Sequence, residues 1–393
     1  MLPSGFLIVA LSGRILARAA ARAGRPAVGV DAFADRDTCE LARAWAQAPL
    51  DSDWNMDADA MLAAAERLCP GRHCHGLVYG SGFEARPDLL RALAATRPLL
   101  GNRPEVLDVL ANPIRFAAML DELGIPHPVT VPTRPADPEG WLCKQAGACG
   151  GVHVRPLAEA RDTDARSYFQ RRVAGDEWSL LFLANGEEAM PIGFNRPLAP
   201  SPGARHPWRY AGAVRQPHGP ERQTEAVLEA AAALTQRLGL KGLNGLDFMV
   251  GDQGWSLLEL NPRPTATVEL WDRAPLPPLF DLHVQACQGR LPTHLPEAAD
   301  SAATALVYAD RPLQVPADFA WPRWCADLPE AGQAMTPGDP VCSVHAEHGT
   351  AAAAERAVLA RREEILHLLE QCQPRSRGDI AAVAAHPGLL TTL

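Results

Sequence analysis

Two short apolar runs separated by a helical segment restrict the fold of this chain more than any other feature. The runs are Phe6–Ala10 and Ala27–Val30, and the segment Ile15–Ala23 between them has helical composition. A strand, a helix and a second strand with short connections form a βαβ unit, and such units build parallel sheets. The sequence therefore predicts a parallel α/β sheet at the N-terminus.

Further segments extend this pattern through residue 110. Gly76–Gly80 reads as another strand and Pro87–Thr96 as another helix, so we predict a doubly wound α/β domain with ligand loops at its strand ends. The turn after the first strand has a single glycine, Gly13, and lacks the G-x-G-x-x-G pattern of dinucleotide sites. Asp31 is therefore predicted to be a solvated residue at a strand end rather than a ribose ligand.

Charge and cysteine content limit the class of protein. The formal net charge is −9, whereas a nucleic-acid-binding surface usually brings a basic excess. A run of about 20 apolar residues is absent, so we expect no membrane span, and the first apolar run is too short for a signal peptide. Nine scattered cysteines favour a reducing, cytoplasmic location. The two cysteines and two histidines within 69–75 could hold zinc, but their crowded spacing does not match a zinc finger.

A second module follows the α/β domain. Pro104–Leu123 reads as one amphipathic helix, and the prolines after it indicate a loop that enters a new module. The strand Trp141–Lys144 is followed by a glycine-rich loop at 145–151. A lysine beside such a loop suits phosphate groups, because glycines let backbone N–H groups approach the oxygens. Glycine-rich loops also join ordinary hairpins, so the pattern alone leaves both interpretations open.

The segment 243–261 reads as a β-hairpin with an acid on each strand. If its strands pair through a three-residue loop at 252–254, Asp247 faces Glu259 directly and Asn261 points to the same side. A two-residue loop would shift the register by one residue and weaken this prediction. Facing carboxylates repel each other, so their burial requires a cation, and oxygen ligands suit Mg²⁺ or Mn²⁺. The alternative, a polar strand facing solvent, conflicts with the leucines that surround Glu259.

In their order along the chain, these features resemble the ATP-grasp superfamily, and within it the carboxylate–amine ligase type related to biotin carboxylase. The motifs are Lys144, the glycine-rich loop, "YFQRRVAGDEWS" at 168–179 and "NGLDFMV…LLELNPRP" within 244–264. The resemblance covers residues 1–290 and implies a chain of mixed α/β and α+β class. It implies a doubly wound α/β domain at 1–110, an ATP-grasp domain with a central antiparallel sheet at 111–290, a small lid within it at 128–175, and a C-terminal β-rich and helical extension at 291–393 that packs on the ATP-grasp domain.

The resemblance also implies roles for the matching residues. The phosphates of ATP would be contacted by Lys144, Gly147, Gly150 and Gly151. The hinge that reads the adenine edge through its backbone would include Gln170, Arg171 and Val173, and the ribose would be bound by Glu177. The metal ligands would be Asp247, Glu259 and Asn261. Arg263 would lie near the transferred phosphoryl group or the carboxylate substrate.

Two positions depart from the family pattern. Arg115 stands where the family often has a lysine on a phosphate, and it keeps the charge and can bind phosphate in bidentate fashion. Gln170 stands where the hinge often begins with glutamate. Neither change removes the implied metal ligands, although both bear on nucleotide preference.

The implied activity is ATP-dependent ligation with Mg²⁺ (or Mn²⁺). A carboxylate would attack the γ-phosphoryl group to give an acylphosphate, and an amine would then displace phosphate to form an amide. The partners would be small-molecule carboxylate and amine substrates, and the chain could form a homo-oligomer. We expect substrate contacts from the loops at 12–14 and 81–82 and from Arg205, Arg209 and Arg215, although a solvated basic loop explains these arginines equally well. The C-terminal segment resembles a carboxylase-related subset that occurs near one-carbon cofactor pathways with glutamate ligases.

Two other functions remain open. A biotin-carboxylase-like enzyme would phosphorylate bicarbonate; the A-M-K-M motif of a biotin carrier is absent, although a separate subunit could supply it. A catalytically inactive ATP-binding subunit is permitted by the departures at Arg115 and Gln170. The intact Asp247, Glu259 and Arg263 argue against it, because buried facing acids serve no purpose in an inactive site.

Overall fold

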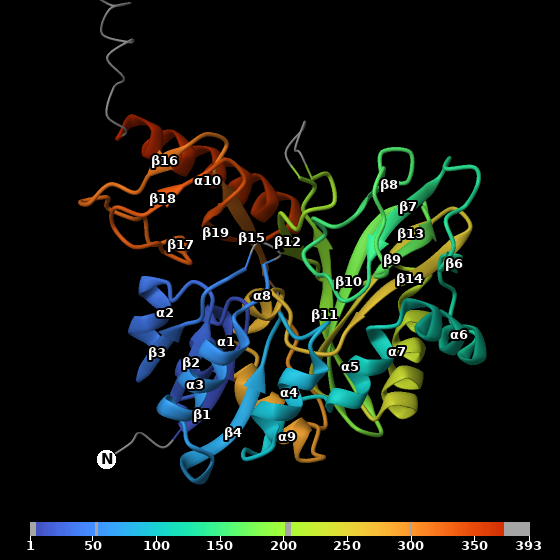
Figure 1. Cartoon of the computed structure of the whole chain (residues 1–393), viewed down its shortest axis with the longest axis horizontal. Helices are drawn as coiled ribbons and strands as arrows, with labels where there is room; N and C mark the ends of the chain where they lie inside the picture. Colours follow the sequence, from blue (N-terminus) through green and yellow to red (C-terminus); the bar gives the residue numbers. More distant parts are fainter. Residues whose placement is uncertain (1–4, 52–53, 201–205, 299, 373–393) are drawn as a thin grey trace, which may run out of the picture.

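The structure, a computed structural model, describes residues 5–51, 54–200, 206–298 and 300–372 (Figure 1). Within these residues, the chain forms a five-stranded N-terminal sheet, an eight-stranded central sheet, a four-stranded small sheet and a short two-stranded ribbon. The N-terminal sheet, blue in Figure 1, lies beside the central sheet, and the C-terminal segment, orange to red, lies above the N-terminal sheet in this view. None of the helices in these ranges is both long enough and apolar enough to cross a bilayer.

The N-terminal sheet is parallel, with the strand order β3-β2-β1-β4-β5, and the predicted parallel α/β architecture is confirmed. Its strands are β1 (Gly5–Val9), β2 (Ala27–Asp31), β3 (Ala44–Gln47), β4 (Cys74–Tyr79) and β5 (Leu99–Leu100). The connecting helices are α1 (Arg14–Arg22), α2 (Arg36–Leu41), α3 (Ala58–Leu68), the 3₁₀ turn η1 (Gly71–His73) and α4 (Pro87–Ala94). Because β2, β1 and β4 are neighbours, the loops after them meet at one edge of the sheet.

Asp31, at the end of β2, is fully buried, so the predicted solvated position is wrong. Its carboxylate accepts hydrogen bonds from the backbone N–H groups of Gly13 (2.8 Å), Phe33 (3.1 Å) and Ala34 (2.7 Å). These donors belong to two neighbouring loops and replace water around the charge. Residue 13 is a glycine because a Cβ there would lie 2.3 Å from the Trp45 ring.

The helical region before the small sheet is two helices, α5 (Pro104–Leu110) and α6 (Pro113–Leu123), rather than the single helix predicted. Pro113 has no N–H group to continue the first helix, but it is well suited to start a second one. The side chain of Asn112 caps α6 by accepting hydrogen bonds from the N–H groups of Ile114 (3.2 Å) and Arg115 (3.0 Å).

The small sheet lies in the part of the chain where the sequence predicts a lid. It is antiparallel in the order β6-β9-β7-β8. Its strands are β6 (Thr130–Val131), β7 (Trp141–Gln145), β8 (Arg155–Pro156) and β9 (Ser167–Arg171). The glycine-rich loop connects β7 to β8, and β9 leads directly into the central sheet.

The central sheet is antiparallel in the order β14-β13-β10-β11-β12-β15-β19-β17. Its strands are β10 (Asp176–Asn185), β11 (Ala189–Pro197), β12 (Gly212–Arg215), β13 (Lys241–Gly251), β14 (Gly254–Asn261), β15 (Ser301–Tyr308), β17 (Cys325–Ala326) and β19 (Pro340–His348). The C-terminal strands therefore extend the sheet itself. The remaining elements are α7 (Thr224–Leu238), α8 (Val268–Trp271), α9 (Leu279–Cys287), the ribbon of β16 (Leu313–Gln314) and β18 (Ala334–Met335), and α10 (Ala351–Gln371), which packs on β15 and β19.

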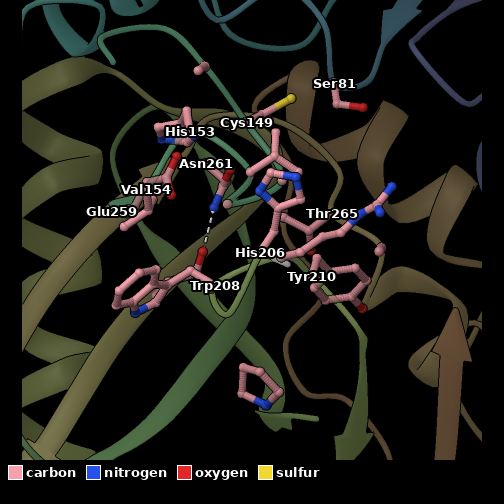
Figure 2. Close-up of a pocket in the computed structure, with 18 of the residues that line it drawn as sticks. Ser81, Cys149, His153, Val154, His206, Trp208, Tyr210, Glu259, Asn261 and Thr265 are labelled. Carbon is pink, nitrogen blue, oxygen red and sulfur yellow. Dashed lines mark hydrogen bonds between the residues drawn. The ribbon is translucent and has the colours of Figure 1, made fainter. Parts of the chain in front are cut away.

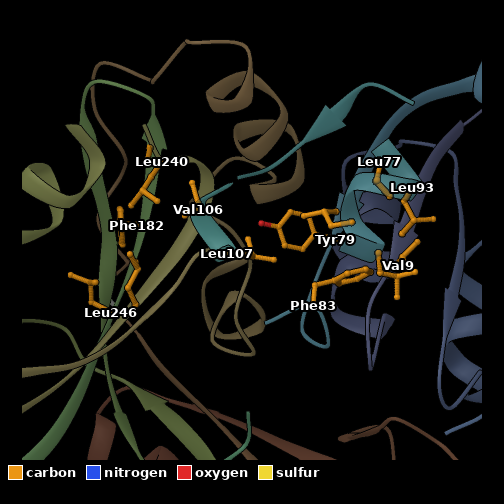
Figure 3. Packing of buried hydrophobic residues seen from close by; sticks show 14 of the residues in the cluster. Val9, Leu77, Tyr79, Phe83, Leu93, Val106, Leu107, Phe182, Leu240 and Leu246 are labelled. Carbon is orange, nitrogen blue, oxygen red and sulfur yellow. The ribbon is translucent and has the colours of Figure 1, made fainter. Parts of the chain in front are cut away.

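One apolar cluster runs from the N-terminal sheet into the central sheet (Figure 3). Val9 and Leu77 belong to it at one end, Phe182 and Leu246 at the other, and Leu107 of α5 lies between them. Burial of each such side chain stabilises the fold by about 1.5–3 kcal/mol. Because the cluster is continuous, its packing sets the position of the two sheets relative to each other.

His283, on α9, joins β13 to β5 and should make stability depend on pH. Its Nδ1 accepts a hydrogen bond from the Leu243 N–H (2.9 Å), and its other nitrogen donates to the Leu100 carbonyl (3.1 Å). Burial lowers the pKa of His283 to about 4. The unfolded chain takes up this proton near pH 6.5, so the stability that His283 contributes is present above pH 6.5 and is lost as the pH falls toward 4.

Because of His283, we expect the free energy of unfolding to fall by about 2 kcal/mol when the pH is lowered from 7 to 5. Denaturant unfolding of the wild-type protein and of His283→Gln at both pH values measures it. The carboxylates titrate in both proteins, so only the difference between the two pH dependences reports on His283. An identical pH dependence in the variant would contradict the expectation.

Candidate active site

The hairpin of β13 and β14 brings the two predicted acids face to face. Asp247 pairs directly with Glu259, as predicted. The predicted three-residue loop is wrong, because Gly251 pairs with Gly254 and only two residues connect the strands. The register changes between the loop and the acids, where Leu258 is the extra residue of a β-bulge. The bulge offsets the short loop and restores the facing pair.

Asn261 lies near Glu259 in the cavity (Figure 2). Its Nδ2 donates to the Asp247 carboxylate at 2.8 Å. Burial raises the pKa of Asp247 to about 8, with added repulsion from Glu259 and Glu177, while Arg263 opposes the shift. The Glu259 side chain is open to the cavity, but protein surrounds that cavity, and this burial raises the pKa of Glu259 as well. Both acids would lose their proton more readily beside a cation.

Lys144 lies on β7 and lines the same cavity as the acids. Its Nζ donates to Oε1 of Gln170 on β9 at 2.7 Å, and the Gln170 amide donates to the Thr130 hydroxyl at 3.2 Å. Burial lowers the pKa of Lys144, whereas the negative charges of Glu259 and Glu177 raise it. Burial likewise raises the pKa of Glu177, and the Lys144 charge lowers it. The lysine and the acids are therefore close enough to influence one another.

The predicted hinge connects the small sheet to the central sheet. The Arg171 N–H donates to the Val129 carbonyl (2.9 Å), and its guanidinium lies over the Trp141 ring and donates to the Glu139 carbonyl (3.0 Å). Val173 lines the cavity just before β10 begins. The side chain of Arg171 thus packs on the small sheet.

The glycine-rich loop closes against a segment of the chain before β12. The Tyr210 N–H donates to the Gly150 carbonyl at 3.1 Å. Gly150 and Gly151 have φ angles of +72° and +75°. A Cβ on Gly151 would lie 1.8 Å from the Trp208 carbonyl oxygen, whereas a Cβ on Gly150 would meet nothing within 4 Å. Gly147, at the start of the loop, lies against Ala85 of the N-terminal domain.

Gly151→Ala should detach this loop from the Trp208 segment, whereas Gly150→Ala should leave it in place. Both variants carry the strain of a left-handed alanine, about 1–2 kcal/mol, but only the first also clashes with a backbone carbonyl. The readout is the hydrogen-exchange rate of the Tyr210 N–H, which donates to the Gly150 carbonyl and which we expect to exchange about tenfold faster in Gly151→Ala than in Gly150→Ala. Equal exchange rates in the two variants would contradict this contact.

Arg263 lies at the exit of β14 and lines the cavity. Its Nε donates to the Glu84 carboxylate at 2.6 Å, and its Nη2 donates to the side-chain amide oxygen Oδ1 of Asn261 at 3.1 Å. The carbonyl of the preceding Pro262 accepts hydrogen bonds from the Tyr79 hydroxyl (3.0 Å) and the Asn102 amide (2.7 Å).

The sequence analysis missed the three N-terminal-domain residues that make these contacts, Tyr79, Glu84 and Asn102. They lie 160 or more positions before their partners, and the sequence offers no pairing rule over such a separation. Tyr79 ends β4, and Glu84 lies in the loop after β4, which was predicted to carry ligand contacts. That position is the one signal that could have singled them out.

Arg115 is not brought to this cavity. It lines a separate pocket of about 310 Å³, with Arg103, Glu122 and Arg237. On α6, Phe116 and Leu120 face the main cavity, whereas Arg115 and Glu122 lie on the other side of the helix. At 100° per residue, Arg115 cannot share the face of its neighbour Phe116.

The arginines predicted to contact the substrate have different surroundings. Arg14 is buried and donates to Glu269 and, at 2.7 Å, to Asp327, so it ties α1 to α8 and to the C-terminal segment. Arg215 is buried as well, and donates to the Leu270 carbonyl and to Asp300. Both therefore have structural partners in place of a substrate. Arg209 lines the cavity with its guanidinium over the Tyr308 ring, and Arg205 lies outside the described residues.

The cavity has a volume of about 2050 Å³ and is lined by loops of the N-terminal domain, by the small and central sheets and by the C-terminal segment. Ser12, Ser81 and Gly82, from loops predicted to contact the substrate, border it. Across the described ranges, no three His, Cys, Asp or Glu side chains are grouped closely enough to bind a metal by themselves. Asp247, Glu259 and Asn261 offer two carboxylates and an amide, a donor set that fits Mg²⁺ when phosphate oxygens complete the coordination.

The fold is of the ATP-grasp type, and the comparisons with known proteins show it. Residues 110–267 match the family model described as an ATP-grasp domain, so the chain contains an ATP-grasp domain. No curated protein sequence matches the chain.

Solved structures with the same fold include the following three. Biotin carboxylase from Campylobacter jejuni, in complex with β-γ-ATP, is 13% identical, with 97% of this chain and 98% of that chain covered and a TM-score of 0.69. N5-carboxyaminoimidazole synthetase from Staphylococcus aureus is 14% identical, with 92% and 98% covered and a TM-score of 0.65. The biotin carboxylase domain dimer of 2-oxoglutarate carboxylase from Hydrogenobacter thermophilus, with MgADP, ADP and bicarbonate, is 11% identical, with 91% and 90% covered and a TM-score of 0.68. At these identities, the likeness concerns the fold.

Proposed function

We propose that this protein is an ATP-dependent ligase that converts a carboxylate to an acylphosphate and then joins it to an amine. The observation that carries the proposal is the facing pair Asp247 and Glu259 on the wall of a large cavity. Lys144 and Arg263 line the same cavity. Acidic and cationic side chains arranged in this way suit a nucleoside triphosphate with its metal ion.

In the proposed complex, the nucleotide lies between the small sheet and the central sheet. Lys144 and the backbone N–H groups of the glycine-rich loop would contact the phosphates. The backbone of the hinge that contains Gln170 and Val173 would contact the adenine, and Glu177 would bind the ribose hydroxyls. Arg115 has no role in this proposal, because it lines a different pocket.

Asp247, Glu259 and the Asn261 amide oxygen would hold Mg²⁺ or Mn²⁺. When bound, the metal neutralises phosphate oxygens and so favours attack by an anionic carboxylate. Arg263 would attract that carboxylate, which otherwise approaches a negatively charged phosphoryl group. Closure of the glycine-rich loop against the Trp208 segment would exclude water, since an exposed acylphosphate hydrolyses.

The second candidate is phosphorylation of bicarbonate, as in a biotin carboxylase. The specific observation in its favour is the likeness in fold to the Campylobacter jejuni biotin carboxylase, which extends over 97% of this chain. In this version bicarbonate would take the position of the carboxylate substrate, and no amine would be needed for ADP formation.

The deciding experiment measures ADP release from Mg-ATP with a panel of carboxylates and amines, alone and in pairs, and with bicarbonate in parallel. ADP release that requires both a carboxylate and an amine supports the ligase. Release with bicarbonate alone supports the second candidate. ATP binding without ADP release under every condition would indicate an inactive ATP-binding subunit, and absence of ATP binding would contradict both candidates.

A further inference from the structure

Glu84 contacts Arg263 from the loop that follows β4 of the N-terminal sheet. The two side chains are enclosed, with exposed fractions of 16% for Glu84 and 12% for Arg263, and their Nε–Oε1 distance is 2.6 Å. The second oxygen of Glu84 accepts the backbone N–H of Gly82 at 2.7 Å. Both oxygens of the carboxylate therefore have protein donors, and the side chain is held in one orientation.

The hydrogen bonds of Arg263 divide its guanidinium into a held end and a free end. The Nε end is bonded to Glu84, and one Nη2 hydrogen is bonded to Asn261 at 3.1 Å. Among the described residues, the only hydrogen bond that Nη1 makes is a long one of 3.5 Å to the Pro264 carbonyl. The Nη1 end thus keeps donors for a ligand in the cavity that Arg263 lines.

The backbone before Arg263 is held from the same side. The Pro262 carbonyl accepts hydrogen bonds from Tyr79 and Asn102, both of the N-terminal domain. Flanking prolines further restrict the backbone torsions around Arg263. Only the side-chain torsions of Arg263 would remain free, and the bond to Glu84 limits these.

We propose that Glu84 is a positioning residue that orients Arg263 so that its Nη1 end receives the carboxylate of the substrate. This inference rests on the proposed function for the identity of the ligand. A guanidinium binds a carboxylate best when two parallel N–H groups point at its two oxygens. Glu84 occupies the Nε end and so leaves the outer end of the fork for that contact.

The test compares Glu84→Gln with Glu84→Ala. Both variants lack the negative charge, but only glutamine keeps an oxygen that can accept the Arg263 Nε–H, so their difference isolates this hydrogen bond. The probe is acetate, titrated in the presence of MgADP. Binding is followed by the ¹⁵N resonance of the Arg263 Nε–H group, which is assigned by its absence in Arg263→Lys.

We expect a sharp Nε–H resonance in the wild-type protein and in Glu84→Gln, and a resonance lost to solvent exchange in Glu84→Ala. Because that variant lacks the resonance, its acetate binding is measured by calorimetry. Acetate should bind Glu84→Ala about tenfold more weakly than Glu84→Gln. Glu66→Ala is the control, because it removes the carboxylate partner of another enclosed arginine, Arg97, and should change neither readout.

Equal acetate affinities in the two Glu84 variants, or an unchanged Nε–H resonance in Glu84→Ala, would overturn the proposal. Failure of the wild-type protein to bind MgADP would count against the proposed function instead. In that event the Nε–H comparison, made without nucleotide, still decides whether Glu84 orients Arg263.

Discussion

Glu259→Gln is expected to reduce ATP turnover at least about a hundredfold, because it removes one of the two facing carboxylates that would hold the metal. Glutamine keeps the size of the side chain and the hydrogen-bonding capacity of one oxygen, so the hairpin should keep its register. The measurement is the rate of ADP formation with the substrates that the screen identifies.

Glu187→Gln is the matched control for this variant. It makes the same chemical change at an exposed position in the turn between β10 and β11 of the same sheet. We expect its turnover to stay within about twofold of the wild-type value. Undiminished turnover in Glu259→Gln would reject the assignment of the acids to a metal, whichever substrates are used.

Arg14→Ala is expected to reduce the free energy of unfolding by about 3 kcal/mol. Arg14 is 1% exposed and donates to Glu269 and Asp327, which belong to α8 and to the C-terminal segment. Removal of the guanidinium leaves the buried Glu269 carboxylate and the half-buried Asp327 carboxylate with fewer partners. Arg18 and His345 remain near Glu269, which keeps the expected loss at the lower end for a broken buried ion pair.

Arg25→Ala provides the comparison for this loss. Its partner Asp281 lies at 2.7 Å, a distance like that in the Arg14 pairs, but the Arg25 side chain is 50% exposed. Solvent screens such a pair, so we expect a loss below about 1 kcal/mol. Denaturant unfolding of both variants measures the two losses. A loss in Arg14→Ala no larger than that in Arg25→Ala would contradict the structural role of Arg14.

The local elements could be predicted from the sequence because each depends on neighbouring residues. The parallel sheet follows from the spacing of the apolar runs, and the facing of Asp247 and Glu259 follows from the alternation of side chains along strands. The loop between those strands was predicted one residue too long, and the bulge at Leu258 was not foreseen. The shorter loop and the bulge offset each other, so the prediction that the two acids face each other was still correct.

The environments of individual polar residues could not be predicted because they depend on distant parts of the chain. Asp31 was expected in water, but it accepts a hydrogen bond from Gly13, which precedes it by a helix. Arg215 was expected near a substrate, but it bonds to Asp300, which lies 85 positions later. Glu84 was missed because its partner, Arg263, lies 179 positions later. Local patterns carry no information on such pairings.

The most direct test of the account is whether the facing acids hold a divalent metal together with a nucleotide. Mn²⁺ binding in the presence of ADP can be followed by electron paramagnetic resonance, in which free Mn²⁺ gives a sharp signal that weakens on binding. We expect that the wild-type protein binds Mn²⁺ with ADP, and that the double variant Asp247→Asn, Glu259→Gln loses this binding while it still unfolds cooperatively. Equal Mn²⁺ binding by the two proteins would contradict it.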